Sequence, residues 1–369
     1  MKRVMVLLLA FSVLLSGCSL LSNQYVSVTP HRDSYAGEES KVIIASNYTE
    51  LRAALAELVH SGAETGIIHV SEYNTVLLEQ GLRDAVHYVQ NYDAIGAYCV
   101  ESIEYEQGTS GIVPAVAVTV RYLHDRRAIQ QISTVRSSES LWEMVVTALQ
   151  RCEAGLVVYV ESYTEQDLIQ MVEDYVGENP ATVMEMPRVS YEVYPDSGKD
   201  RVVALKFTYQ NSRTDLRQMQ SQVQPIFNSA VQYAKGGTDY QKLQRLYSFL
   251  MERFSEYQIK TSITPSYSLL HHGVGDSRTF AIVYAQMCRM AGVNSQVVTG
   301  TLQGEPWYWN LVESDGTFYH VDLLRSHEEN GFRLLTDEQM AEYVWDYSAY
   351  PACVGAVQEE TTEETGAEN

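Results

Sequence analysis

The sequence predicts a multidomain chain of mixed α/β and α+β architecture, in which two tandem α/β modules precede a third folded unit. The chain has 369 residues, of which 45% are hydrophobic and 20% charged, so it is globular and longer than one ordinary domain. Strand and helix signals alternate from residue 41 to about residue 122 and then recur in the same order. The predicted segments are a leader (1–17), a tether (18–40), the first module (41–125), the second module with a linking helix (126–235), the third unit (236–353) and an acidic tail (354–369).

The N-terminus has the pattern of an export signal. Lys2 and Arg3 precede an apolar run of 12 residues from Val4 to Leu15, which is shorter than the ~20 residues that a membrane-spanning helix needs. The run ends in Leu15-Ser16-Gly17-Cys18, which resembles the lipobox of bacterial lipoproteins. The resemblance implies that Cys18 is lipidated, becomes the mature N-terminus and anchors an outward-facing protein to the cell membrane. An ordinary signal peptide with an incidental cysteine is the alternative.

The net charge excludes one class of partner. The chain has 26 Lys and Arg residues against 47 Asp and Glu, which gives a net charge of −21. Proteins that bind nucleic acid rely on clustered cations, so no nucleic-acid partner is expected. Residues 359–369 are rich in glutamate and contain no apolar residue except Ala367, which predicts a disordered acidic tail.

The first module begins with a short apolar strand at 41–45 and a helix whose N-cap is Asn47, with Glu50 at the capping-box position. A second strand opens at Gly66, a second helix follows, and two strands close the module. Both helices are predicted from apolar stripes at helical spacing. The stripes are Leu51, Ala54, Leu55, Leu58 and Val59 in the first helix and Leu78, Leu82, Ala85, Val86 and Val89 in the second.

The second module repeats this order at an offset of 87–90 residues. HVSEY at 69–73 matches YVESY at 159–163, and the alternating strands at 116–122 and 203–209 are 87 positions apart. The predicted helices carry the stripes Leu141, Met144, Val145, Ala148, Leu149 and Leu168, Val172, Tyr175. Tandem duplication explains the offset, and chance likeness of two α/β segments is the alternative. Neither module contains a Gly-rich phosphate loop or a set of metal ligands, so we expect no cofactor and no metal, and a binding or spacing role.

Four cysteines follow Cys18, at positions 99, 152, 288 and 353. An exported chain could oxidise them, and four cysteines allow three pairings. Each one sits in an apolar or element-ending context, so free buried thiols are the alternative.

The third unit carries the most specific motifs. Thr238 and Gln241 form a capping box before an amphipathic helix. Three further stretches are HHGVGDSRTFAIVYAQMCRMAGVNSQVVTG at 271–300, WYWNLVESDGTFYHVD at 307–322 and FRLLTDEQM at 332–340. This succession resembles the transglutaminase-like superfamily, whose members have a papain-like, cysteine-protease-type fold and a Cys-His-Asp triad. The resemblance covers residues 238–350 and implies that fold for the third unit.

The resemblance also implies that the triad is degenerate. Counting from Gly273, the family cysteine falls on Ser277, the family histidine on Trp307 and the family aspartate on Asp322. A cysteine at a helix N-terminus is activated by the helix dipole and a neighbouring imidazolium, whereas a serine hydroxyl gains little there and needs a base. Ser277 and Asp276 are also preferred N-cap residues, which is an ordinary structural role.

A hairpin at Asp315-Gly316 would bring two of these residues together. That turn sets Trp309 opposite Asp322 and places Trp307 diagonal to it on the same face. The indole N–H can then donate to the carboxylate, but indole has no acceptor nitrogen and cannot act as a general base. Aromatic side chains favour recognition, so the candidate binding residues of the cleft are Trp307, Tyr308, Trp309 and His320.

The sequence contains two other sources of catalytic groups near Ser277. His271 or His272 could approach Ser277 from the preceding segment, whereas Cys288 lies three helical turns further on, about 16 Å away, and cannot replace the nucleophile. Gly275-Asp276-Ser277 is similar to the Gly-Asp-Ser block of esterases, but no Asp-x-x-His follows it. The serine also lacks the following glycine of a nucleophile elbow.

Together these observations predict a lipid-anchored cell-surface protein with a catalytically inactive transglutaminase-like domain. Its partner would be a peptide or a cell-wall polymer bound in the cleft. A purely scaffolding role, with partners held by the duplicated modules, is a second possibility. The alternative from another class is a serine-dependent hydrolase, or a transglutaminase- or protease-like enzyme, that uses Ser277.

Overall fold

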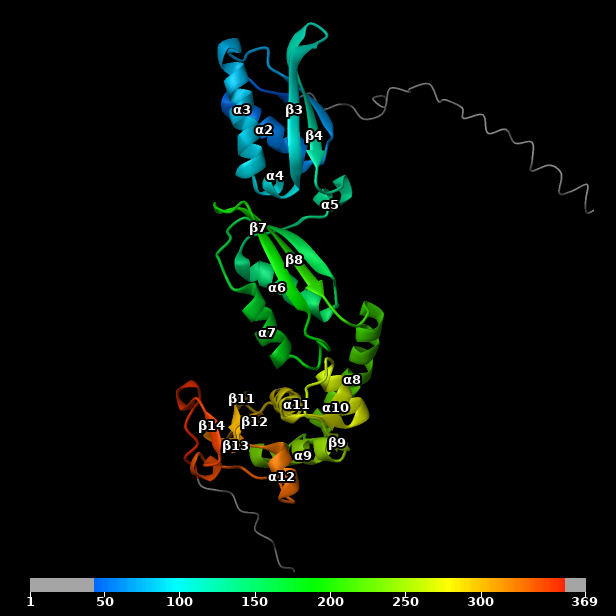
Figure 1. The fold of residues 1–369 in the computed structure, drawn as a ribbon, viewed down its shortest axis with the longest axis vertical. Helices are drawn as coiled ribbons and strands as arrows, with labels where there is room; N and C mark the ends of the chain where they lie inside the picture. The colour runs from blue at the N-terminus through cyan, green and yellow to red at the C-terminus, as the bar shows by residue number, and fades with distance from the viewer. Residues whose placement is uncertain (1–42, 356–369) are drawn as a thin grey trace, which may run out of the picture.

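The computed structural model describes residues 43–355, so the leader, the tether with Cys18 and most of the acidic tail lie outside the described residues. Three units follow one another along the longest axis of the molecule (Figure 1). Within the described range, no helix is both long enough and apolar enough to cross a membrane.

The first unit is a four-stranded sheet with helices α2 and α3 on one face (Figure 1). Its elements are β1 (Ile43–Ile44), α2 (Tyr48–His60), β2 (Thr65–His69), α3 (Thr75–Asn91), α4 (Ala94–Cys99), β3 (Val100–Ser110), β4 (Val113–Tyr122) and α5 (Arg126–Gln130). The strand order is β1-β2-β4-β3, with β1 parallel to β2 and the other pairs antiparallel. Asn47 caps α2 by accepting a hydrogen bond from the Glu50 N–H at 3.1 Å, and the predicted stripe of α2 is buried throughout.

The second unit has the same strand order and the same strand directions. Its elements are β5 (Ser133–Val135), α6 (Ser138–Gln150), β6 (Gly155–Val160), α7 (Leu168–Glu178), β7 (Arg188–Tyr194) and β8 (Arg201–Thr208). The order is β5-β6-β8-β7, with β5 parallel to β6 and the other pairs antiparallel. The stripe of α6 is buried except for Met144, which is only partly covered.

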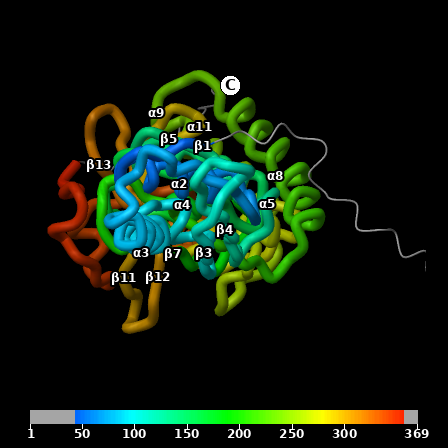
Figure 2. The backbone as a smooth tube through the Cα atoms, turned by 90° about the horizontal axis from the view of Figure 1, so that it is seen from above, coloured from blue at the N-terminus to red at the C-terminus, as the bar shows by residue number. Residues whose placement is uncertain are grey.

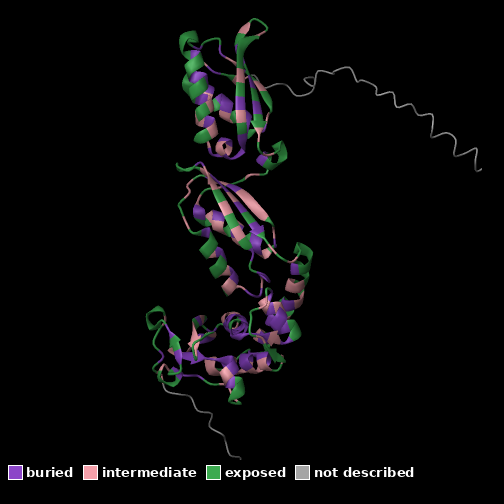
Figure 3. Ribbon diagram, in the orientation of Figure 1, coloured by how far each residue is buried: buried purple, intermediate pink, exposed green. Residues whose placement is uncertain are grey.

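The third unit packs helices against an antiparallel sheet of order β13-β12-β11-β14. Its elements are α8 (Arg213–Tyr233), α9 (Asp239–Met251), β9 (Glu256–Tyr257), α10 (Pro265–His272), β10 (Val274–Gly275), α11 (Ser277–Met290), β11 (Ser295–Leu302), β12 (Glu305–Ser314), β13 (Thr317–Val321), α12 (Leu323–Glu328), η1 (Glu338–Met340), β14 (Tyr343–Trp345) and η2 (Tyr347–Ala349). The capping box of Thr238 and Gln241 starts α9, as predicted. Helix α11 lies in the middle of this unit with most of its residues buried (Figure 3). Ser277, the first residue of α11, therefore lies at the N-terminal end of this central helix.

Helix α8 belongs to the third core rather than to a free linker. Its buried residues lie in one hydrophobic cluster with α9, α10 and α11. They are Leu216, Val223, Phe227 and Ala230. The core of the third unit therefore begins N-terminal to Gly236, where the sequence pattern places a boundary. Seen from above, α8 runs along the outside of the molecule (Figure 2).

Four short α-helices of the described chain were not predicted: α4, α5, α10 and α12. Each spans 5–8 residues, which is too short to display a helical period in the sequence. Their apolar side chains are buried against other elements, as Ile129 and Leu269 are. Tertiary packing, not propensity, selects the helical conformation there.

The four cysteines of the described chain are free and buried. Burial raises the pKa of Cys99 to about 12 and that of Cys353 to about 12, so both are thiols at neutral pH. The free-thiol interpretation is therefore the one that the structure supports, and the disulfide alternative is not seen among these residues.

Candidate functional site

Ser277 is the first residue of helix α11 and is 5% exposed. Its neighbour Asp276 caps the helix by accepting a hydrogen bond from the Thr279 N–H at 2.9 Å, and it also accepts from the hydroxyls of Thr279 and Thr261. Among residues 43–355, the Ser277 hydroxyl has no hydrogen-bond partner. No base is therefore in contact with the proton that a serine nucleophile must lose.

Asp322 is a buried carboxylate surrounded by donors. Its Oδ1 accepts hydrogen bonds from the backbone N–H groups of Leu324 at 3.0 Å and Arg325 at 3.1 Å, which makes it the N-cap of α12. Its Oδ2 accepts from the Trp307 indole N–H at 2.6 Å and the Tyr343 hydroxyl at 2.7 Å. Burial raises the pKa of the Asp322 carboxyl, and these hydrogen bonds oppose the rise. Four donors use the acceptor positions of the carboxylate, which therefore links α12 to Trp307 of β12 and Tyr343 of β14.

The Trp307–Asp322 hydrogen bond is the contact that the hairpin geometry predicted. The β12–β13 ladder pairs Ser314 with Thr317 and Asn310 with Val321, so the next position sets Trp309 opposite Asp322. Trp307 lies two residues further along and reaches the carboxylate diagonally. An indole thus occupies the position where the family resemblance places the histidine.

Tyr257 was missed by the sequence analysis. Its ring stacks on Trp307 with the ring centroids 6.1 Å apart. Burial raises the pKa of the Tyr257 phenol, and the nearby carboxylates of Asp276 and Asp322 raise it further. The Tyr257–Trp307 stack therefore lies near both Asp276, the cap of α11, and Asp322.

The space around Ser277 is too narrow to hold a water molecule. Its lining residues are Ser277, Phe280, Ala281, Tyr308, Trp309, Asn310, Asp322, Leu323 and Leu324. The volume open to a water molecule there is about 0 Å³. Asn310 helps to narrow it, since its side-chain amide donates to the Ala281 carbonyl at 2.9 Å.

Two of the four candidate binding residues are core residues. Trp309 is 1% exposed and His320 is 0% exposed, so neither can touch a ligand in this structure. The expectation that they form part of a binding surface is wrong, because strand alternation turns them toward the packed face that Tyr343 and Trp345 cover. Trp307 and Tyr308 are partly exposed, and their part in binding stays a prediction.

The structure brings together one group with the chemistry of metal ligands, which the sequence analysis did not anticipate. The ligating atoms of His320, Asp337 and Cys353 lie within 4.8 Å of one another. His320 Nε2 lies 2.9 Å from Asp337 Oδ1, while its Nδ1 accepts a hydrogen bond from the Trp309 indole at 3.0 Å.

The tautomer of His320 argues against a metal. An indole N–H only donates, so Nδ1 must be unprotonated and Nε2 must carry the proton that it donates to Asp337. A metal on Nε2 would need that proton on Nδ1, where it would face the indole N–H. The other Asp337 oxygen accepts from the Cys353 N–H at 3.0 Å. The group is therefore a hydrogen-bonded tie between β13 and the end of the described chain.

The other histidines and Cys288 are not at the site. His271 and His272 are exposed at the end of α10, where His271 stacks on the Tyr267 ring and His272 meets that ring edge-on. Neither hydrogen-bonds to Ser277 in the described chain. Cys288 is fully buried, and burial raises the pKa of its thiol.

A central helix that places residue 277 against an antiparallel sheet, with Asp322 at the end of the neighbouring hairpin, is the arrangement that the motif order implied. The described residues thus form a mixed α/β fold with several sheets, and its third unit carries Ser277 and Trp307 at the positions where the resemblance places the family cysteine and histidine. Residues 228–328 match the family model of the transglutaminase-like superfamily. The chain therefore contains a transglutaminase-like domain.

Several solved structures are similar to this chain. A TGase crystal structure aligns at 10% identity with a TM-score of 0.27, over 54% of this chain and 64% of the other. A candidate protease from Parabacteroides distasonis aligns at 11% identity with a TM-score of 0.22, over 69% and 39%. A candidate cysteine protease from Cytophaga hutchinsonii aligns at 12% identity with a TM-score of 0.26, over 43% and 71%. The chain thus spans less than two thirds of the first two structures. No curated protein matches the chain.

Proposed function

We propose that this chain is a lipid-anchored, outward-facing membrane protein whose transglutaminase-like domain is catalytically inactive and serves as a binding or scaffolding module. The observation that carries the proposal is the 2.6 Å hydrogen bond from the Trp307 indole to Asp322. An indole in the family's histidine position has no lone pair with which to take a proton from a nucleophile. Ser277 has neither the low pKa of a cysteine nor a base in contact with it.

The narrow space around Ser277 favours binding of a partner through other surfaces. A substrate carbonyl would need a place within about 3–3.5 Å of the Ser277 oxygen. The residues around Ser277 leave no volume even for water. A peptide or a cell-wall polymer remains the proposed class of partner, held by the outer faces of the domain or by the two preceding modules.

Ser277 provides the test against the alternative of a serine hydrolase. We expect no peptide hydrolysis, no transamidation and no labelling by a fluorophosphonate, because the hydroxyl has no base. Both the unmodified chain and Ser277→Ala would then give the same background. Fluorophosphonate labelling that disappears in Ser277→Ala would establish the serine enzyme and refute the inactive domain.

Cys18 provides the test of the anchor. The mature chain is expected in the membrane fraction and Cys18→Ala in the soluble fraction, since two or three acyl chains on one residue anchor stably. Cell fractionation with incorporation of a labelled fatty acid measures this. Cys99→Ala, which removes a buried thiol, is the matched control and should stay with the membrane. Equal membrane retention of Cys18→Ala would contradict lipidation at this residue.

We further propose that the first two units arose by tandem duplication. Support comes from their common strand order and from matched local features 90 positions apart. Asn47 and Ser137 both cap the first helix, and Gly62 and Cys152 both adopt positive φ, at 68° and 52°, in the turn that follows it.

A further inference from the structure

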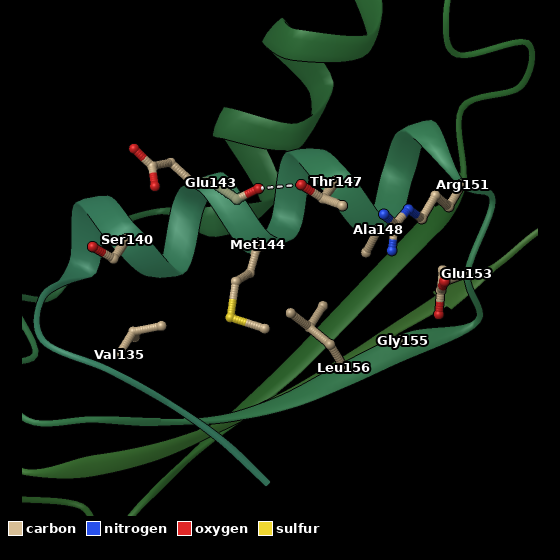
Figure 4. A pocket seen from close by; sticks show the side chains of 10 residues that line it. All are labelled: Val135, Ser140, Glu143, Met144, Thr147, Ala148, Arg151, Glu153, Gly155 and Leu156. Atoms are coloured by element: carbon tan, nitrogen blue, oxygen red, sulfur yellow. Dashed lines mark hydrogen bonds between the residues drawn. The ribbon is translucent and has the colours of Figure 1, made fainter. Parts of the chain in front are cut away.

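The second unit contains an open pocket of about 430 Å³ that lies between α6 and β6. Its apolar lining residues are Val135, Met144, Ala148 and Leu156, and Figure 4 shows Met144 on α6 and Leu156 on β6 pointing into the same space. This volume falls within the range of ligand pockets, ~300–1,000 Å³. The pocket is remote in sequence from the Ser277 region and concerns a different unit.

One edge of the same pocket is an unpaired length of β-strand. β5 pairs with β6 only from Val158 to Val160, although β6 begins at Gly155. In the described part of the chain, no strand pairs with Gly155–Val157 on that edge. The residue before β5, Ile132, packs against the core of the first unit.

The main-chain groups at this edge point outward. The Glu161 N–H donates to the Val135 carbonyl, which fixes the side of β6 that faces β5. N–H and C=O groups alternate sides along a strand, so Gly155 and Val157 direct theirs to the same edge, beyond the end of β5. Residues 155–157 are half-buried, and unpaired donors and acceptors on an open strand edge are the groups that an added strand satisfies.

The charge at one end of the pocket selects for a carboxylate. Arg151 lines the pocket, and Figure 4 shows its side chain turned back toward Ala148. Among residues 43–355, its guanidinium has no ion-pair or hydrogen-bond partner. Two acidic residues also line the pocket: Glu153 is paired with Arg213 at 3.1 Å, and the Glu143 side chain points away from β6 in Figure 4. The unpaired cation therefore lies next to the first residues of β6.

The first unit has filled the equivalent space. At the positions 90 residues earlier, Leu58 replaces Ala148 and Gly66 replaces Leu156. The Leu58 methyl groups lie 2.4 and 2.6 Å from where a Cβ on Gly66 would be, so Leu58 occupies that volume. The pocket is thus specific to the second unit. There the small residue, Ala148, is on the helix and the large one, Leu156, is on the strand, whereas in the first unit the large residue is on the helix and the small one on the strand.

We propose that this pocket binds the C-terminal end of an extended peptide. The peptide adds as a short antiparallel strand to Gly155–Val157, places an apolar side chain among Met144, Ala148 and Leu156, and sets its terminal carboxylate against Arg151. The antiparallel direction follows because Arg151 lies at the N-terminal end of β6. This inference stands whether or not the transglutaminase-like domain is catalytic.

The test measures binding of a labelled peptide to the chain from Cys18 to Asn369, which carries no lipid when produced without its leader. The probe is the hexapeptide Ser-Thr-Val-Thr-Val-Leu with N-terminal fluorescein, and fluorescence anisotropy is read in 0.15 M salt to screen the acidic surface. The free acid should bind at least about tenfold more tightly than the C-terminal amide, since a hydrogen bond to a charged group is worth that factor or more.

Two variants separate the parts of the proposal. Arg151→Gln should remove the difference between acid and amide. The pair Ala148→Leu with Leu156→Gly, which copies the first unit, should weaken binding of both peptides at least about tenfold. Arg83→Gln, an exposed arginine on α3, is the matched control and should change nothing. Circular dichroism verifies folding of each variant.

The proposal fails if the unmodified chain binds neither peptide. It also fails if acid and amide bind equally, or if the pocket-filling pair binds as well as the unmodified chain.

Discussion

Asp322→Ala is expected to lower the free energy of unfolding of the third unit by about 3–5 kcal/mol. The substitution leaves four donors without their acceptor, and an unpaired buried donor costs about 1–3 kcal/mol. The melting temperature should fall by roughly 10–20 °C. Tryptophan fluorescence reads this unit well, because Trp307, Trp309 and Trp345 lie in it, and Trp142→Phe removes the remaining signal from the second unit.

Asp346→Ala is the matched control for this experiment. Asp346 is also an N-cap carboxylate, accepting from the Ser348 N–H at 2.9 Å, but it is exposed. Losing an exposed cap costs about 1 kcal/mol. If Asp322→Ala lowered the free energy of unfolding no more than Asp346→Ala does, the four hydrogen bonds to Asp322 would not stabilise the third unit, and the prediction would be wrong.

Ser277→Cys combined with Trp307→His is expected to create a reactive thiol. An imidazole at position 307 would lie between Asp322 and the N-terminus of α11, where an imidazolium and the helix dipole stabilise a thiolate. A thiol pKa near 6 in place of about 8.5 raises the thiolate fraction at pH 6 by about two orders of magnitude. A thiolate of lower pKa is also a weaker nucleophile, so the rate of alkylation rises by less than the thiolate fraction does. We expect alkylation by iodoacetamide at pH 6 to be about tenfold faster than in Ser277→Cys alone.

A second double variant tests whether the thiol at position 277 reacts faster because of an ion pair with the imidazolium at position 307 or only because removing the indole exposes the thiol. Ser277→Cys with Trp307→Phe removes the indole without supplying an imidazole, so its thiol should react as slowly as that of Ser277→Cys. The four native cysteines of the described chain are buried and give a low background. Equal reactivity of the histidine and phenylalanine variants would show that position 307 does not face residue 277 in the way that the histidine of the family triad faces its cysteine.

The helices that have a clear apolar period or a capping residue in the sequence were predictable. The stripes of α2, α3 and α6 and the caps Asn47 and Thr238 appear at the predicted residues because helix period and capping depend on residues three or four apart. The Trp307–Asp322 contact was predictable for the same reason, since a two-residue turn sets the register of its hairpin.

The short helices and the start of the third core were not predictable in this way. Helix α10 shows too few residues for a period, and α8 is assigned to the third unit only by what its apolar face touches. The state of the cysteines is also a matter of packing, because a thiol stays free when no second sulfur lies near it.

The residue sequence by itself determined which residues stand at positions 277, 307 and 322, which are serine, tryptophan and aspartate. It also determined the hairpin that joins Trp307 to Asp322, because the turn and the strand register of a hairpin depend on residues within one short segment. Only the tertiary structure decided that Tyr257 and Tyr343 join that pair and that His320 is buried against Asp337. It also decided that a pocket opens beside β6. These features bring together side chains from separate segments of the chain, and no local period or turn determines such contacts.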